Sequence, residues 1–170
     1  MPIPADLYKR LHRYRWLLAL ALGVFVADQV SKWIIAATLP YNTPDHVTVI
    51  PGFFFIVHIG NPGAAWGLFA GMSMWLAVLA VGTLAMIYLF RRHLELRRTA
   101  MQVSFGLLCG GIVGNLVDRL IHGHVIDFLL FTFGRLGDWP AFNIADSAIC
   151  VGVGLYIVQS FRSSKEERTA

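Results

Sequence analysis

The stretch "FNIADSAICVGVGLYIVQSF", residues 142–161, decides the class of fold. Almost all of its side chains are apolar or small, and about 20 residues of helix are enough to cross the hydrocarbon core of a bilayer. Asp146 is the one charged residue of the stretch, and a carboxylate in the first turns of such a helix is costly in lipid. The stretch therefore predicts a membrane-spanning helix and raises the question of what Asp146 does at its start.

Three apolar stretches of similar length precede it, at about 16–39, 72–90 and 101–121. Of the 170 residues, 56% are apolar and 14% are charged, whereas a soluble domain has about a quarter charged residues. The first apolar stretch follows a basic segment, but it is too long for a cleaved signal peptide and is expected to be retained. We therefore expect an all-α polytopic membrane protein, a single membrane domain over residues 1–170 with four transmembrane helices.

Residues 40–71 are expected to form a small β-containing region outside the membrane, between the first and second helices. "VTVI" (47–50) and "FFFIVHIG" (53–60) have β-strand composition and are separated by Pro51-Gly52, which favours a turn. The aromatic residues of this segment are expected at the level of the lipid headgroups. They are Phe53, Phe54, Phe55, Trp66 and Phe69.

Basic residues predict how the chain is oriented in the membrane. Of the 14 Lys and Arg residues, four precede the first stretch, four lie between the second and third, and three follow the fourth. The two segments expected on the opposite side contain one, Arg135. The positive-inside rule therefore predicts cytoplasmic N- and C-termini. The net charge of +4 is explained by topology and anionic lipid, so we expect no nucleic-acid partner.

Polar side chains from three different helices are predicted at one depth, near the outer end of each helix. They are Asp28 and Lys32 in the first helix, Asn115, Asp118 and Arg119 in the third, Asp127 just beyond it, and Asn143 and Asp146 in the fourth. Residues spaced i, i+4 share a helix face, so Asp28 and Lys32 also fit a structural ion pair. Asn143 and Asp146 fit a helix N-cap. Their common depth nevertheless favours a polar site.

Small residues predict that the third and fourth helices pack closely together. Gly106, Gly110 and Gly114 form a GxxxGxxxG stripe, and Ala148 and Gly152 form a matching pair in the fourth helix. Such residues let two helix backbones approach each other. This packing, and the short connection between the helices, would bring Asp127 and Asp146 to the same end of one helix pair.

Two neighbouring carboxyl groups can share a proton, because both cannot easily ionise at once. One can then take a proton from water while the other donates a proton to a carbonyl oxygen, as in aspartic proteases and without a metal. Three alternatives remain from the residues alone. They are a proton-coupled transporter, a metalloenzyme using His122, His124 and Asp127, and a purely structural four-helix subunit.

Five short motifs, in order along all four helices, resemble bacterial lipoprotein signal peptidase, also called signal peptidase II. They are "DQVSK" (28–32), "NPGAAW" (61–66), "GNLVDR" (114–119), "VIDF" (125–128) and "FNIAD" (142–146). Trp66 stands where that family usually has Phe. The resemblance implies an aspartic endopeptidase in which Asp127 and Asp146 are catalytic. It also implies that Asn61, Asn115, Arg119 and Asn143 lie near the substrate, and that Asp28 and Lys32 support the site.

The same resemblance implies the substrate and the cellular location. The substrate would be a prolipoprotein with a diacylglyceryl cysteine, cut just before that cysteine to release the signal peptide. The enzyme would lie in the bacterial inner membrane with its active site near the periplasmic face, surrounded by membrane lipid. Cyclic peptide antibiotics would be inhibitors, the protein would be a monomer, and no cofactor or metal is expected.

Overall fold

The structure is a computed structural model that describes residues 12–64 and 67–169. Within this part of the chain, four helices are long and apolar enough to cross a membrane. They are α2 (Arg15–Thr38), α3 (Ser73–Phe90), α4 (Thr99–His122) and α5 (Ile144–Thr169). The expected polytopic helical fold with a small β region is confirmed. Trp66, which was expected at the headgroup level, lies outside the described residues.

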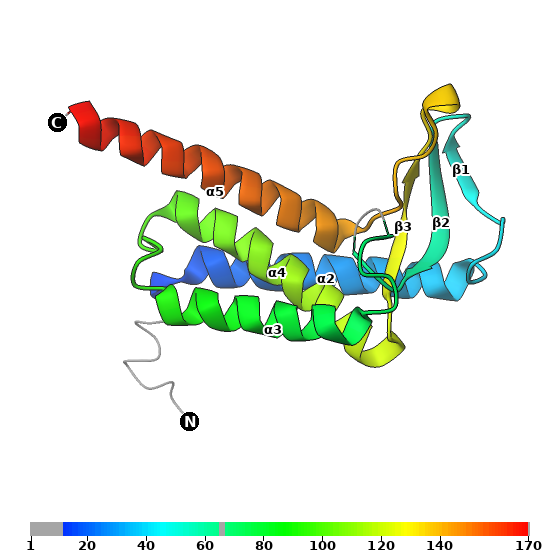
Figure 1. Ribbon diagram of the computed structural model, residues 1–170, viewed down its shortest axis with the longest axis horizontal. Coiled ribbons are helices and arrows are strands. Elements are labelled where there is room, and N and C mark those ends of the chain that lie inside the picture. Colours follow the sequence, from blue (N-terminus) through cyan, green and yellow to red (C-terminus); the bar gives the residue numbers. More distant parts are fainter. Residues whose placement is uncertain (1–11, 65–66, 170) are drawn as a thin grey trace.

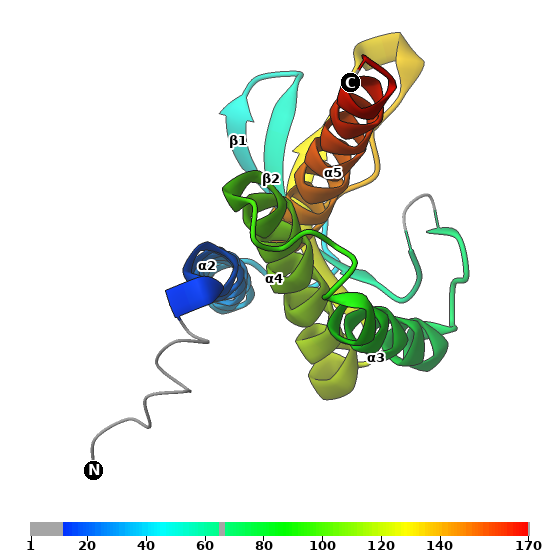
Figure 2. The same ribbon diagram turned by 90° about the vertical axis from the view of Figure 1, so that its left-hand side faces the viewer.

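Helix α4 is the centre of the bundle, with the other helices around it (Figure 2). In its most apolar 18-residue window, 56% of the residues are buried, whereas the corresponding share is 17% in α2 and 6% in α3. The exposed apolar surface of α2, α3 and α5 is therefore the surface that faces lipid, as expected for helices in a bilayer. Only α4 has protein on most of its sides, which suits it to hold polar side chains away from lipid.

A three-stranded antiparallel sheet lies at one end of the helices (Figure 1). Its strands are β1 (Val47–Ile50), β2 (Phe54–Asn61) and β3 (Val125–Phe131), in that order across the sheet. The first two agree with the predicted β segments between the first two helices. Strand β3, which follows α4, was not predicted, and it adds the segment containing Asp127 to the sheet.

The opposite end of the molecule contains the start of α2, the connection from α3 to α4, and the C-terminal end of α5 (Figure 1). The described parts of the basic segments that were assigned to one side of the membrane are therefore at one end, and the sheet is at the other. Lys9 and Arg10 lie outside the described residues. Which end faces the cytoplasm follows only from the charge rule and stays a prediction.

The prediction that the glycine stripe of the third helix packs against the fourth is wrong for Gly106 and Gly110. A Cβ at Gly106 would lie 2.9 Å from the carbonyl oxygen of Leu17, and one at Gly110 would lie 2.7 Å from that of Ala21. Both glycines therefore allow close approach of α2, not α5. The small-residue pattern indicated that a helix packs there, but it does not specify which helix.

Contacts between α4 and α5 involve a different set of small residues. A Cβ at Gly111 would collide with the Ala145 carbonyl oxygen, and a Cβ at Gly152 would lie 2.7 Å from the carbonyl oxygen of Ser104. Gly114 faces both the Asp28 carboxylate and Ala145. Close packing of both α2 and α5 against α4 is what allows polar side chains from all three helices to meet.

Candidate active site

The start of α5 is fixed by reciprocal hydrogen bonds between Asn143 and Asp146. The Asp146 backbone N–H donates to Asn143 Oδ1 at 2.9 Å, and the Asn143 backbone N–H donates to Asp146 Oδ2 at 3.2 Å. This is the capping box that the sequence suggested. It uses only one of the two carboxylate oxygens of Asp146, so capping does not account for the whole side chain.

Strand β3 brings Asp127 beside the same cap. Phe142 and Leu129 exchange backbone hydrogen bonds of 2.8 and 3.1 Å, which extends the sheet up to the residue before Asn143. The Asn143 Nδ2 group then donates to Asp127 Oδ1 at 2.7 Å. Asn143 is completely buried and therefore links the two acidic residues, through its side chain to Asp127 and through its backbone to Asp146.

Two more asparagines donate hydrogen bonds to the remaining oxygen of each carboxylate. Asn61 Nδ2, at the end of β2, donates to Asp127 Oδ2 at 2.9 Å. Asn115 Nδ2, in α4, donates to Asp146 Oδ1 at 2.7 Å. Each of the four carboxylate oxygens thus accepts one hydrogen bond from a neutral N–H group, a pattern that fixes the orientation of both acids without neutralising them.

A buried ion triad contacts Asn115, one of these asparagines. Lys32 Nζ is 2.8 Å from both Asp28 Oδ2 and Asp118 Oδ2, and it donates to Asn115 Oδ1 at 3.0 Å. Lys32 and both carboxylates are almost fully buried, and charges in such a place need partners. Asp28 and Lys32 were expected to pair, but Asp118 was not among the predicted site residues. The sequence signal for Asp118 was its position between Asn115 and Arg119, in the polar end of the third helix.

The triad also anchors the two backbone segments that contain the acidic pair. Asp28 Oδ1 accepts a hydrogen bond of 3.0 Å from the N–H of Ala145, next to Asp146. Asp118 Oδ2 accepts one of 3.1 Å from the N–H of Ile126, next to Asp127. The first and third helices therefore position both acidic residues through the backbone of their neighbours.

Arg119 connects this layer to the loop after β2. One guanidinium nitrogen donates to the carbonyl oxygen of Gly63 at 3.2 Å and another to that of Asn115 at 3.3 Å. Its Nε atom is buried and has no hydrogen-bond partner among the described residues. Asn61 in turn accepts a hydrogen bond from the Gly63 N–H at 2.9 Å through its own Oδ1. All eight predicted site residues therefore belong to one connected cluster.

The pKa of Asp127 is raised from its ordinary value of 3.8 to about 7. Burial is the largest cause because it penalises the charged carboxylate, and repulsion from Asp146 raises the pKa further. Hydrogen bonds from Asn61 and Asn143 act in the opposite direction and do not outweigh burial. Asp127 can therefore hold a proton near neutral pH while it faces a second carboxylate.

A cavity of about 320 Å³ lies beside Asp146. Asp146, Asn61 and Arg119 are on its wall, and most of the remaining lining is apolar, including Trp139 and Phe142. Apolar walls with a few polar groups are typical of a site for a largely apolar ligand. No group of three or more His, Cys, Asp or Glu side chains in residues 12–64 and 67–169 is arranged to hold a metal ion, so His122, His124 and Asp127 do not form one.

Comparison with known proteins identifies the family of this chain. The model of the signal peptidase (SPase) II family matches residues 20–162. The chain is 43% identical to a lipoprotein signal peptidase of Azoarcus sp. (strain BH72), over 90% of this chain and 86% of that protein. It is 42% identical to one of Neisseria gonorrhoeae, over 90% and 92% of the two chains.

Two solved structures, both described as bacterial membrane enzymes, have the same fold. One superposes with a TM-score of 0.79 at 34% identity, covering 88% of this chain and 90% of the other. The second gives 0.72 at 36% identity, covering 84% and 90%. A family match over most of the sequence, similar relatives and a shared membrane fold lead to one conclusion: this chain is a membrane-spanning peptidase that belongs to the signal peptidase II family.

Proposed function

We propose that this enzyme removes signal peptides from prolipoproteins that carry a diacylglyceryl cysteine, cutting just before that cysteine, with Asp127 and Asp146 as the catalytic pair. The observation that supports it most is the bridge made by Asn143. This one buried residue holds Asp127 at 2.7 Å through its side chain and Asp146 at 3.2 Å through its backbone. Two acidic residues oriented in this way suit the activation of a single water molecule.

In the proposed reaction Asp146 is the base and Asp127 the acid. Asp146 takes a proton from water, and the hydroxide oxygen bonds to the carbonyl carbon of the scissile peptide. Asp127 donates its proton to the carbonyl oxygen, which gives a tetrahedral diol. Collapse of the diol breaks the C–N bond, the proton taken by Asp146 moves to the leaving amine of the cysteine, and Asp127 regains its own proton.

The assignment of the two roles depends on the surroundings of each acid. Asp127, with a pKa of about 7, can be protonated at neutral pH. Asp146 lies in the first turn of α5, where the helix dipole and the N–H groups of Asn115 and Asn143 stabilise negative charge. When two carboxyl groups lie in different environments their pKa values differ, so one can act as the acid and the other as the base.

The remaining cluster would hold the substrate and the acids in place. Arg119 and Asn61 line the cavity and are available to the peptide backbone. The cavity is too small for two acyl chains, so the diacylglyceryl group would stay in the bilayer beside α5.

By the positive-inside rule the sheet end would face the periplasm, and both termini would be cytoplasmic. We also propose that the enzyme acts as a monomer and that cyclic peptide antibiotics inhibit it by covering the acidic pair.

A synthetic precursor peptide tests this function. The purified enzyme is incubated separately with a peptide whose cysteine is diacylglyceryl-modified and with the same peptide bearing a free thiol. The masses of the products are measured by mass spectrometry. We expect one cut, before the modified cysteine. The unmodified peptide should be cleaved at least about a hundredfold more slowly, because it lacks the binding energy of the diacylglyceryl group. Equal cleavage of both peptides, or a cut elsewhere, would contradict the proposal.

The cleavage rate is expected to fall as the pH rises through about 7. Asp127 must be protonated to act as the acid, and its raised pKa of about 7 means that it loses this proton above neutral pH. The kcat value should therefore decrease about tenfold per pH unit well above that point, with an apparent pKa that belongs to the pair. Returning the enzyme to pH 6.5 should restore the rate, which excludes unfolding. A rate that is constant or increases from pH 6.5 to 9 would contradict the assignment of Asp127 as the acid.

A further inference from the structure

The connection between α3 and α4, at the end of the molecule opposite the acidic pair, has an unusual sequence. It reads "RRHLELRR" (91–98), with four arginines around a single acidic residue, Glu95. Topology alone requires positive charge on this side of the membrane, and scattered basic residues would satisfy it. Here the arginines are gathered around a cavity instead.

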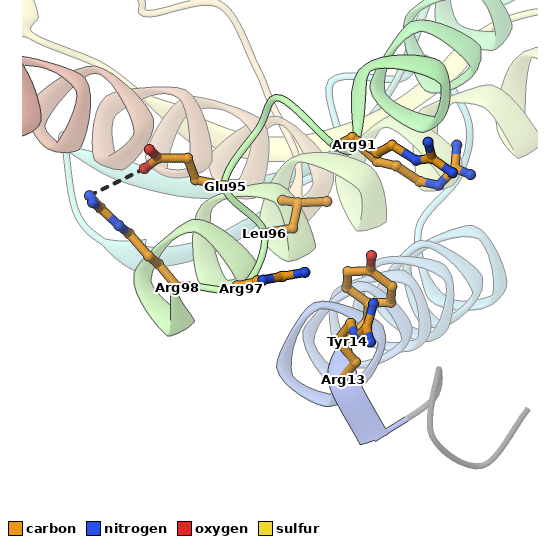
Figure 3. Close-up of a pocket in the computed structure, with 8 residues that line it drawn as sticks. Arg13, Tyr14, Arg91, Glu95, Leu96, Arg97 and Arg98 are labelled. Atoms are coloured by element: carbon orange, nitrogen blue, oxygen red, sulfur yellow. Dashed lines mark ion pairs between the residues drawn. The ribbon is translucent and has the colours of Figure 1, made fainter. Parts of the chain in front are cut away.

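This cavity has a volume of about 700 Å³ and lies between the start of α2 and the connection from α3 to α4 (Figure 3). Arg13 and Tyr14 form its α2 side. The connection contributes the other lining residues, which are Arg91, Arg92, Glu95, Leu96, Arg97 and Arg98. Five guanidinium groups from two distant parts of the sequence therefore surround one space.

Buried Gln102 links the two segments that line the cavity. Gln102 Nε2 donates to the carbonyl oxygens of Arg13 and Leu96 at 3.0 Å each, and Gln102 Oε1 accepts from the Trp16 N–H at 3.2 Å. Leu96 is 6% exposed and packs against Met101 in the core at this end of the bundle. The start of α2 and the arginine-rich connection are thus tied to each other, so the arginines do not depend on a ligand to bring them together.

Positive charge in the cavity is largely uncompensated. The acidic residue of the lining, Glu95, is paired with Arg98 at 3.2 Å. Arg91 lies over the ring of Tyr88 and donates to its carbonyl oxygen. Among the side chains that the structure describes, no carboxylate is within ion-pair distance of Arg13, Arg92 or Arg97. Arginine forks bind phosphate oxygens in pairs, so the missing partner is expected to be a phosphate.

Apolar surface beside the cavity indicates that this phosphate belongs to a lipid. Tyr88, Leu89 and Phe90, at the end of α3, are 64%, 65% and 48% exposed and lead directly into the arginine-rich connection. The N-cap residues of α2 and α4, Tyr14 and Arg98, both line the cavity, which adds the positive ends of two helix dipoles. A basic pocket between helix ends, next to a lipid-facing surface, is the arrangement that binds anionic lipid headgroups.

We propose that this cavity, here called the arginine pocket, binds the phosphate headgroup of an anionic phospholipid, with the acyl chains along α3. The site lies at the other end of the bundle from the acidic pair and is independent of the proposed function.

Lipid competition followed by native mass spectrometry tests the arginine pocket. The full chain in detergent is titrated with equal amounts of dioleoyl phosphatidylglycerol and dioleoyl phosphatidylcholine, which share acyl chains and differ in headgroup charge. We expect the protein to retain phosphatidylglycerol at least about tenfold better, and the variant R13Q/R97Q to lose this preference, because each arginine near the headgroup contributes to lipid binding. Equal retention of the two lipids by the unmodified protein would overturn the proposal.

A matched control removes the same charge elsewhere. In the variant R15Q/R135Q, Arg15 lies two residues from Arg13 without lining the pocket, and Arg135 lies near the sheet. This variant should keep the lipid preference, and an equal loss in both variants would overturn the proposal. Folding of each variant is checked by circular dichroism, and R92Q/R97Q replaces R13Q/R97Q if the latter does not fold. Displacement of the lipid by an equal concentration of glycerol 1-phosphate would overturn the lipid assignment in favour of a soluble anion.

Discussion

Replacing Asp127 or Asp146 by Asn is expected to lower kcat by about two to four orders of magnitude, the range found for general acid–base groups. Asparagine has the same shape and can keep hydrogen bonds in the cluster, but it can neither take a proton from water nor donate one as a carboxylic acid does. Cleavage of the diacylglyceryl precursor peptide by each purified variant measures the effect. The kcat of the double variant should be about equal to that of the less active single variant, because two groups that act together do not give additive losses.

Asp138→Asn is the matched control for charge. Asp138 is an exposed acidic residue in the segment that leads from β3 to α5, at the same end of the molecule as the acidic pair. Its replacement should change kcat less than about twofold, because surface substitutions away from a site have small effects. If Asp127→Asn or Asp146→Asn kept more than a tenth of the turnover while remaining folded, Asp127 and Asp146 could not be the catalytic pair.

The membrane fold could be predicted because its main signals are local. Four long apolar stretches, few charges and an asymmetric distribution of arginines each require only neighbouring residues to be read. The two β segments around Pro51-Gly52 are local for the same reason, since a turn joins adjacent strands. All of these features are present in the structure.

Strand β3 could not be predicted in the same way. "VIDFLLF" has no regular alternation of apolar and polar residues, and its first four residues are buried. A short apolar run of this kind does not distinguish a strand from the end of a helix. Its partner, β2, is more than sixty residues away, as in the pairing of Asn61 with Val125. Only the folded chain brings the two strands together.

The acidic pair was located by depth, whereas its hydrogen bonds were not predictable. Helix rise places polar residues of different helices at one level, but it does not specify the rotation of each helix about its axis. For this reason the i, i+4 spacing indicated the pairing of Lys32 with Asp28, and the second pairing, with Asp118 of another helix, was missed. The glycine stripe failed for the same reason, since its rotation toward α2 depends on the whole bundle.

Lys32→Met is expected to reduce the free energy of unfolding by about 3 to 5 kcal/mol, the usual cost of removing one partner from a buried ion pair. Lys32 is 2% exposed, and its removal leaves the buried carboxylates of Asp28 and Asp118 without a cation at 2.8 Å. Methionine has a similar volume, so the loss should be electrostatic and not a loss of packing. The melting temperature in detergent should fall by about 10 °C for a chain of this size.

Two further variants separate this explanation from a general effect of losing a basic residue. Arg98→Met removes the partner of Glu95, and because both side chains are about half exposed the cost should stay below about 1 kcal/mol. Adding Asp118→Asn to Lys32→Met removes one of the two stranded charges and should restore part of the lost stability, whereas two independent defects would add. If the double variant were less stable than Lys32→Met, the triad could not be held by charge. The anchoring of Ala145 and Ile126 would then have to depend on the hydrogen bonds of Asp28 and Asp118 alone.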